Sequence, residues 1–321
     1  MNLSSKYLLL SAFFFNYYIY TQHLLIFTYA FNRPEFIELQ YKTFKKFLKD
    51  EYEFIVFNDA NTRENEIAIE NICNNLNIKC IRIPQIIHDL PYLPRWDHEP
   101  GFQHGTIRCV NGVQFSLNRL GFFHKGPLLI LDSDMFLIRE FSVKEALNNY
   151  DVISPCQYHN NEKGDMIVHI SIDLILMNIP RLPNKQTFSV NCGFVDNFPT
   201  DAAGQSYWYF KNNPQVRVLY PRHYIILDPK LNCDNHLCKN PDADSKYFAE
   251  RCINPTRNNL EAAGFSNDEI EYIVGGVTNS EFIFNNCFYH YRSGSNWNGR
   301  PKEYHEKKMR LFRDFIEKII Q

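Results

Sequence analysis

Several features are scarce or missing in this sequence of 321 residues, and each absence excludes a class of protein. Only 13 residues are glycine and 16 are proline, which excludes a collagen-like or low-complexity chain. Neither sign of charge dominates, since 34 Lys and Arg stand against 36 Asp and Glu and leave a formal charge of −2. The chain therefore has no excess of positive charge with which to bind a nucleic acid backbone.

Long apolar runs are also scarce. The longest, residues 7–20, is interrupted by Asn16 and falls short of the roughly 20 residues that a membrane-spanning helix needs. Only Lys6 precedes it and no small-residue cleavage site follows it, so we interpret it as a tail or extra helix, with a weak membrane anchor as the alternative. The single Asn-x-Ser/Thr site begins at Asn2 and gives no support to a glycosylated lumenal domain.

The chain has nine cysteines, an odd number in a sequence far longer than a disulfide-rich scaffold. Most lie in apolar or strand-like stretches, which favours a reducing, cytoplasmic compartment. A separate polar group contains Cys233, His236, Cys238 and Cys252. Cys233 and Cys238 have the spacing of a zinc-ligand pair, but the second pair of a zinc site is missing. It stays open whether these four residues bind zinc, form disulfides or do neither.

Apolar strands alternate with amphipathic helices in the first part of the chain. Residues 24–30, 54–57 and 80–83 are short apolar runs with strand-forming residues. Two segments with apolar residues at helical spacing lie between them, and Asn32 and Asn61 are their predicted N-caps. This β-α-β-α-β order predicts parallel strands with helical crossovers, the layout of a nucleotide-binding α/β domain.

The remainder of the sequence is less regular. We expect a helix over 106–120, strands at 152–153 and 174–177, and a charged amphipathic helix over 303–319. Residues 229–259 are polar and form a predicted loop or insertion. Neither the G-x-G-x-x-G fingerprint nor a P-loop is present, so any phosphate must be bound by another device.

Two carboxylates follow the most apolar strand of the chain. Residues 128–131 lead directly into Asp132-Ser133-Asp134. The carboxyl ends of parallel strands are where α/β sheets bind ligands, and residues two apart in an extended segment point to the same side. Two neighbouring carboxylates suit Mg²⁺ or Mn²⁺ carrying a diphosphate. This pair is the strongest functional signal in the sequence.

Together with three further segments, the pair resembles the glycosyltransferases of the GT-A fold over roughly residues 23–300. The α/β half ending near Ile83 resembles their nucleotide-binding half, and Asp132-Ser133-Asp134 resembles their D-x-D motif. Asn191-Cys192-Gly193-Phe194 is similar to a segment near the donor sugar, and His290-Tyr291-Arg292-Ser293-Gly294 to a C-terminal histidine segment. The resemblance implies an α/β, GT-A (Rossmann-like) single domain with a mixed, mostly parallel sheet flanked by helices.

The resemblance also implies how the chain is divided. Residues 23–135 would form the nucleotide-binding half, and residues 136–300 the acceptor and metal half with the polar insertion 229–259. Residues 1–22 would then be an N-terminal tail, and residues 301–321 a C-terminal helix.

A metal site made by Asp132, Asp134 and His290 follows from the same resemblance, and it would hold Mn²⁺ or Mg²⁺ against the diphosphate of a nucleotide sugar. In the retaining family 8-like transferases, which the chain distantly resembles, a glycine follows the histidine by three residues and a lysine comes next. Here Gly294 follows by four residues. Arg292 is expected to take over the phosphate contact, because a guanidinium binds phosphate well. This departure leaves retaining and inverting chemistry both open.

Catalytic and donor-binding residues are implied as well. Asp201 is the first choice for the group that acts on the acceptor or the donor sugar, with Asp196 second and Gln205 as a further candidate. Capping of the following helix is the alternative role of Asp201. Tyr207 and Trp208 are candidate platforms for a sugar ring. The predicted nucleotide-sugar contacts are Tyr29, Arg33, Asp59, Arg108, Asn111, Asp132, Ser133, Asn191, Gly193, Arg292, Gly294 and Trp297.

The leading hypothesis is a metal-dependent glycosyltransferase that moves a sugar from a nucleotide sugar to an acceptor hydroxyl. The resemblance favours UDP as the nucleotide and leaves open the sugar and the acceptor, whether glycan, protein or small molecule. The alternatives are an aspartate-type phosphatase, which also has D-x-D after an apolar strand, a sugar nucleotidyltransferase, and an inactive transferase that serves as a sugar-binding or scaffold protein.

Overall fold

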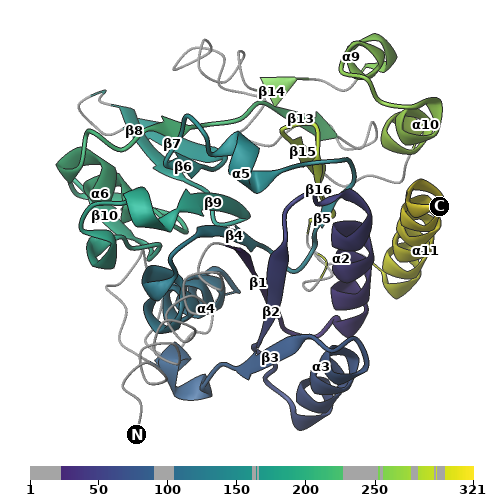
Figure 1. Cartoon of the computed structure of the whole chain (residues 1–321), viewed down its shortest axis with the longest axis horizontal. Helices are drawn as coiled ribbons and strands as arrows, with labels where there is room; N and C mark the ends of the chain where they lie inside the picture. Colours follow the sequence, from purple (N-terminus) through teal and green to yellow (C-terminus); the bar gives the residue numbers. More distant parts are fainter. Residues whose placement is uncertain are drawn as a thin grey trace, which may run out of the picture.

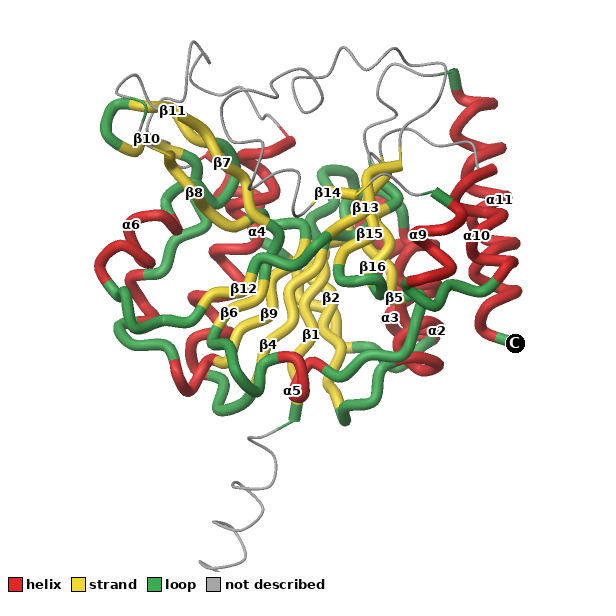
Figure 2. The backbone as a smooth tube through the Cα atoms, turned by 90° about the horizontal axis from the view of Figure 1, so that it is seen from above, coloured by secondary structure: helices red, strands yellow, loops and turns green. Residues whose placement is uncertain are grey.

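A mixed sheet of seven strands forms the centre of the computed structural model (Figures 1 and 2). The structure describes residues 23–89, 105–160, 164, 166–226, 252–253, 256–275, 281–292, 294 and 301–321. The strand order is β12-β6-β9-β4-β1-β2-β3. The bounds of the strands are β1 Leu24–Ala30, β2 Tyr52–Asn58, β3 Lys79–Arg82, β4 Pro127–Leu131, β6 Val152–Ile153, β9 Leu174–Asn178 and β12 Val218–Leu219.

Most neighbours in this sheet are parallel. Strands β4, β1, β2 and β3 run in one direction, and β12 is parallel to β6, whereas β9 is antiparallel to both β4 and β6. Helices α2 Pro34–Phe47, α3 Arg63–Asn75 and α4 Gly105–Arg119 connect the parallel strands. The predicted fold class, an α/β domain with a mixed, mostly parallel sheet flanked by helices, is confirmed.

Helices cover both faces of the central sheet, and strand β1 is therefore buried at every position. Leu25 and Phe27 pack with Val113 of α4 on one face. Leu24 and Ile26 pack with α2 and α3 on the other face. Because successive side chains of a strand point to opposite faces, a strand covered on both sides is a continuous apolar run.

A second sheet of five strands, in the order β14-β13-β15-β16-β5, contacts α2 through β5. Helix α2 contributes Ile37 and Phe44 to the central core, and Phe36 and Leu39 to a core shared with the second sheet and α11. Figure 1 shows α11 alongside α2. The bounds are β5 Met135–Leu137, β13 His223–Ile226, β14 Cys252–Ile253, β15 Glu281–Phe284, β16 Phe288–His290 and α11 Lys302–Ile320.

The remaining described elements are two hairpins, short helices and 3₁₀ turns. The hairpins are β7 Cys156–Asn160 with β8 Met166–Ile170, and β10 Gly193–Val195 with β11 Phe198–Thr200. The helices are α5 Val143–Ala146, α6 Ser206–Asn212, α9 Arg257–Ala262 and α10 Asn267–Gly275. The 3₁₀ turns are η1 Gln85–Asp89, η2 Gly121–Phe123, η3 Ile179–Arg181 and η4 Lys185–Thr187.

Two predicted helix caps are wrong by one residue. Arg33, not Asn32, is the N-cap of α2, and it makes no side-chain capping bond. The N-cap of α3 is Thr62, not Asn61, and its hydroxyl accepts a hydrogen bond from the backbone N–H of Asn65. The predicted helices 106–120 and 303–319 and the predicted strands 152–153 and 174–177 are confirmed as α4, α11, β6 and β9.

Several predictions concern residues outside the described ranges. These are the apolar residues 7–20, most of the insertion 229–259 with Cys233 and His236, and Trp297. Among the described residues, none of the helices combines the length and the apolar character that crossing a membrane requires.

Candidate functional site

The two carboxylates of the D-x-D segment lie in a tight turn between the two sheets. Strand β4 ends at Leu131 and strand β5 begins at Met135, whose backbone N–H donates to the Asp132 carbonyl at 3.2 Å. The Ser133 N–H donates to Asp132 Oδ1 at 2.9 Å. The predicted extended segment is therefore wrong, since residues 132–135 form a turn. A turn nevertheless brings Asp132 and Asp134 to the same place, at the carboxyl edge of the central sheet.

His290 joins the two carboxylates through the second sheet. Strand β16 is antiparallel to β5, with His290 opposite Met135, so the imidazole lies beside the preceding residue, Asp134. His290 Nε2 and Asp134 Oδ1 are 3.3 Å apart, and both side chains are buried. One ligand atom from each of Asp132, Asp134 and His290 lies within 4.8 Å of the other two. Two carboxylates and an imidazole suit Mn²⁺ and related divalent cations.

The titration of these three groups reflects their burial and their mutual charge. Burial, with the neighbouring charges of Asp134 and Asp173, raises the pKa of Asp132 to about 7. Burial opposes ionisation of Asp134 as well, but the charge and hydrogen bond of His290 outweigh it and hold the pKa of Asp134 below its usual range. Burial alone would lower the pKa of His290, but Asp134, Asp173 and Asp132 raise it to about 9. In the metal-free protein the group therefore retains protons that a cation would displace.

Asp132, Asp134 and His290 together are called the metal group below. Gly294 lies against this group on the side of α2. Its backbone N–H donates to Asp134 Oδ2 at 2.7 Å, and its carbonyl accepts from the Arg33 guanidinium at 2.5 Å. A Cβ at this position would lie 2.5 Å from the ring of Phe36 and 3.0 Å from Asp134. Arg292, two residues earlier, has a left-handed backbone with φ of 54°, and burial lowers its pKa. The predicted Arg292 and Gly294 thus lie at the metal group.

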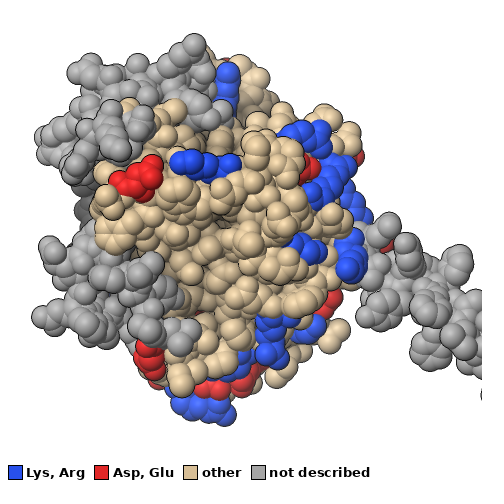
Figure 3. Space-filling view, turned by 90° about the vertical axis from the view of Figure 1, so that its left-hand side faces the viewer, with Lys and Arg blue, Asp and Glu red and all other residues tan. Residues whose placement is uncertain are grey.

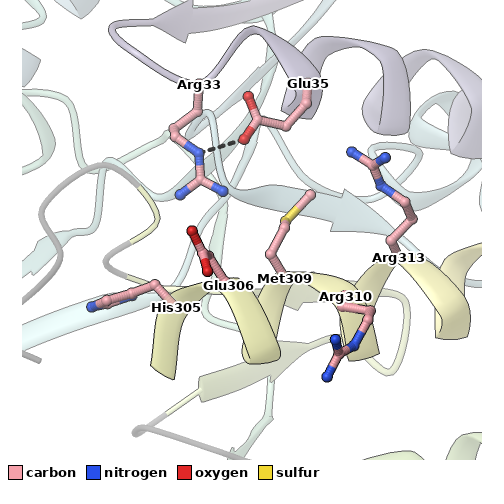
Figure 4. Close-up of a pocket in the computed structure, with 7 residues that line it drawn as sticks. All are labelled: Arg33, Glu35, His305, Glu306, Met309, Arg310 and Arg313. Carbon is pink, nitrogen blue, oxygen red and sulfur yellow. Dashed lines mark hydrogen bonds and ion pairs between the residues drawn. The ribbon is translucent and has the colours of Figure 1, made fainter. Parts of the chain in front are cut away.

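Arg33 itself lies in a pocket between the start of α2 and helix α11 (Figure 4). Its Nε donates to Glu35 at 2.6 Å. In Figure 4, Glu306 faces Arg33, whereas Arg310 points away from it. The pocket of about 350 Å³ is lined by Arg33, Glu35, His305, Glu306, Met309, Arg310 and Arg313. Arg33 therefore touches the metal group through the Gly294 carbonyl, and its predicted contact with the donor stays a prediction.

A buried polar network contains three of the predicted donor contacts, Asp59, Arg108 and Asn111. Asp59 follows strand β2, and its Oδ2 is 2.9 Å from Arg108 Nε. Its Oδ1 lies 2.7 Å from His88 Nε2 and accepts from Arg108 at 2.9 Å. Asn111 Nδ2 is 3.4 Å from His88 Nδ1, and Arg108 also donates to Gln85 at 2.5 Å. His88 and Gln85 were not predicted, because no sequence motif marks either residue.

Tyr29 belongs to the core beneath this network. Its hydroxyl is 2.6 Å from Ser116 Oγ, and its ring stacks on Phe57 with the ring centroids 5.6 Å apart. Burial raises the pKa of the Tyr29 hydroxyl above its usual value. A role in donor binding stays a prediction.

The segment from Asn191 to Gln205 forms a separate part of the predicted site. A Cβ on Gly193 would collide with the side chain of Gln205, whose Nε2 donates to the Phe194 carbonyl at 3.2 Å. Trp208 Nε1 donates to the same carbonyl at 3.3 Å. Asn191 contributes its backbone carbonyl, which accepts from the Gln205 N–H at 3.1 Å. The glycine is therefore required for Gln205 to occupy its place.

Two carboxylates of this segment differ in their surroundings. Asp196 is exposed in the two-residue turn of the β10–β11 hairpin, where its φ of 47° is left-handed. Asp201 Oδ1 accepts from the backbone N–H of Ala202 at 2.7 Å. Helix α6 begins at Ser206 with Gln205 as its N-cap, so the capping alternative for Asp201 is wrong. The catalytic roles of both residues stay predictions.

Two residues of the metal region were not found from the sequence. Gln40 of α2 donates from Nε2 to the carbonyls of Asp132 and Met135, each at 3.0 Å, and so anchors the turn. Asp173 precedes β9, and its carbonyl accepts from the Asp132 N–H at 3.0 Å. A polar residue on the buried face of α2 was a signal for Gln40, whereas nothing local marks Asp173.

No family model and no curated protein sequence matches the chain. The galactosyltransferase LgtC, solved with donor and acceptor sugar analogs, is similar with a TM-score of 0.44 and 12% identity over 90% of this chain and 95% of that one. The mannosyltransferase PcManGT from Pyrobaculum calidifontis, solved with GDP-Man and Mn²⁺, has a TM-score of 0.36 and 11% identity over 62% of this chain and 54% of that one. The bifunctional glycosyltransferase WbbM has a TM-score of 0.38 and 10% identity over 62% of this chain and only 38% of that one. At these values the similarity does not define a family.

Proposed function

We propose that this protein is a metal-dependent glycosyltransferase of the GT-A fold that uses a nucleotide sugar, with UDP as the favoured nucleotide. The observation that carries the proposal is the group of Asp132, Asp134 and His290, whose ligand atoms lie within 4.8 Å of one another. The group lies at the carboxyl end of β4, on the edge of the sheet where α/β proteins bind ligands. Mn²⁺ suits the imidazole and carboxylate donors, and Mg²⁺ is the alternative.

A cation held by these residues would neutralise the charge that develops on the departing nucleoside diphosphate. Asp132, Asp134 and His290 must all lose their protons to hold it. The Gly294 N–H fixes the orientation of the Asp134 carboxylate at 2.7 Å. Arg292 is assigned to the phosphate oxygens, because its guanidinium carries a permanent charge and several donors.

We assign the network around Asp59 to the nucleoside end of the donor. Asp59 follows β2 and Asp132 follows β4, and both strands flank β1 in parallel, so the network and the metal group lie at the same edge of the sheet. Arg108 binds both oxygens of Asp59. Asp59 therefore holds Arg108 and His88 in place, and the polar groups of Asn111 and His88 are assigned to the base or ribose.

The acceptor is assigned to the side of α6 and β10. Asp201 would act on the acceptor or the donor sugar as a base or hydrogen-bond acceptor, with Gln205 beside it. Phe194 is exposed and Trp208 is half-buried, and both offer ring surface to a sugar. Figure 3 shows the side of the molecule that is on the left in Figure 1. Few charged residues lie at the centre of this face, which favours a neutral acceptor over a polyanion.

The proposal is tested by incubating the full chain with a panel of sugar nucleotides and Mn²⁺ and measuring release of the nucleoside diphosphate. Asp132→Asn and Asp134→Asn should abolish Mn²⁺-dependent release, and Asp268→Asn is the matched control because it is an exposed carboxylate paired with Lys318 on the surface. Release of phosphate from p-nitrophenyl phosphate without donor turnover would refute the proposal. Mn²⁺-dependent donor binding without turnover would instead support the inactive, sugar-binding alternative.

A further inference from the structure

Asp173 lies directly opposite Asp132 across two antiparallel strands. Strands β4 and β9 pair with Leu131 opposite Leu174, and one further step places Asp132 opposite Asp173. The Asp132 N–H donates to the Asp173 carbonyl at 3.0 Å, which continues the pairing beyond the ends of both strands. This hydrogen bond brings Asp173 beside Asp132 just beyond the ends of the two strands, although neither residue belongs to a strand.

The Asp173 carboxylate is held by one serine hydroxyl. Ser171 Oγ donates to Asp173 Oδ2 at 2.8 Å. Ser154 Oγ in turn donates to the carbonyl of Ser171 at 2.9 Å, and both serines are buried.

Two carboxylates held close together repel each other when both are ionised. The charge of Asp173 acts on Asp132, on His290 and on Arg292. Asp173 nevertheless does not belong to the group whose ligand atoms lie within 4.8 Å of one another, so it is not placed to bind the same cation directly. Mn²⁺ and Mg²⁺ keep water ligands when few protein groups bind them, and such waters are held by carboxylates outside the first ring of ligands.

We propose that Asp173 is a positioning residue of the cation site, which holds a water ligand of the divalent cation on the β9 side of Asp132. The inference rests on the proposed function, because it needs a cation bound by Asp132, Asp134 and His290. A bound cation would compensate the repulsion between the carboxylates of Asp132 and Asp173. It also explains why Ser171 orients the carboxylate.

Mn²⁺ binding to the full chain, measured by calorimetry at pH 8 without any nucleotide, tests the inference. Asp173→Asn keeps the size of the side chain and an oxygen for Ser171 but removes the charge, and it should weaken Mn²⁺ binding roughly 10- to 100-fold. Ser171→Ala keeps the charge but removes its anchor and should weaken binding by a smaller factor. Asp50→Asn is the matched control, since Asp50 is a buried carboxylate that also accepts from a serine, Ser142, but lies at the start of α5, where it accepts from the backbone N–H of Val143.

A KM-against-kcat comparison separates this role from a merely structural one. With Asp173→Asn, the Mn²⁺ concentration for half-maximal donor turnover should rise, while turnover at saturating Mn²⁺ recovers. If the wild-type chain binds Mn²⁺ and the Asp173→Asn variant binds it with the same affinity, the inference is overturned and the proposed function stays intact. Failure of the wild-type chain itself to bind Mn²⁺ would overturn the proposed function and this inference together.

Discussion

Gly294 and Asp134 are joined by a hydrogen bond that only glycine can make in this place. The Gly294 N–H donates to Asp134 Oδ2 at 2.7 Å, and a Cβ would lie 2.5 Å from Phe36 and 3.0 Å from Asp134. Phe36 cannot retreat easily, because it is buried against Phe136 and Tyr291. The close approach of the Gly294 backbone to the side chains of Asp134 and Phe36 is therefore a condition for the geometry of the metal group.

Gly294→Ala is expected to destabilise the protein and to weaken Mn²⁺ binding together. The added methyl group overpacks a buried site, which costs roughly 1–3 kcal/mol of unfolding free energy. The comparison is Gly105→Ala, where a Cβ would meet nothing within 4 Å. Urea unfolding and Mn²⁺ calorimetry on both variants measure the effect. Equal unfolding free energies for the two variants would contradict it.

Asp132→Asn is expected to stabilise the metal-free protein at pH 8 while abolishing Mn²⁺ binding. The folded protein raises the pKa of Asp132 to about 7, so keeping this half-buried carboxylate ionised beside Asp134 at pH 8 costs folding free energy. Removing the charge should recover on the order of 2 kcal/mol. At pH 4, where the folded wild type is already neutral at this position, the difference should shrink. Thermal unfolding at both pH values, with EDTA present, checks the sign.

Mn²⁺ binding should strengthen as the pH rises from 6 to 9. The cation must displace the protons of Asp132, with its pKa of about 7, and His290, with its pKa of about 9. Both pKa values are raised by folding, so both groups stabilise the metal-free protein at low pH and lose that contribution as the pH rises through these values. The increase in Tm on adding Mn²⁺ should therefore be larger at pH 9 than at pH 6, and a constant increase would contradict this assignment.

The alternating strands and helices were predictable because their signals are local. Strand β1 is buried at every position, since both of its faces are covered, and β2 is buried from Phe54 to Asn58. The D-x-D pair was predictable for the same reason, because a buried strand directly precedes it. Asp132 and Asp134 do not point to the same side of an extended segment, as predicted, because residues 132–135 form a turn. His290 came from a family resemblance, not from any local pattern.

What the sequence did not show depends on pairing between distant segments. Asp173 meets Asp132 only because β9 is inserted antiparallel beside β4, with about 40 residues of chain between them. Strands β5 and β16 have three residues each, too few to show a period, although their pairing places His290 beside Asp134. His88 and Gln85 reach Asp59 through a 3₁₀ turn that has no marked composition.

Arg108→Met should destabilise the protein strongly, because it leaves the Asp59 carboxylate buried without its ion pair. Both side chains are buried, and Arg108 Nε is 2.9 Å from Asp59 Oδ2. Breaking a buried pair on one side costs about 3–5 kcal/mol. The double variant Asp59→Asn, Arg108→Met should recover part of this loss in urea unfolding. A double variant less stable than Arg108→Met would show that the ion pair is not the source of the loss.

Gly193→Ala and Gln205→Ala should be strongly non-additive. A Cβ on Gly193 would collide with the end of the Gln205 side chain, so Gly193→Ala alone should displace this side chain, break its hydrogen bond to the Phe194 carbonyl and cost about 0.5–1.5 kcal/mol. Gln205→Ala removes every atom involved in the collision, and the glycine substitution should then cost far less. Urea unfolding of the two single variants and the double variant gives the coupling energy.

In the donor-release assay, Gly193→Ala should lower turnover as much as Gln205→Ala, since both remove the Gln205 side chain from its place. Additive unfolding free energies would mean that Gly193 serves another purpose than making room for Gln205.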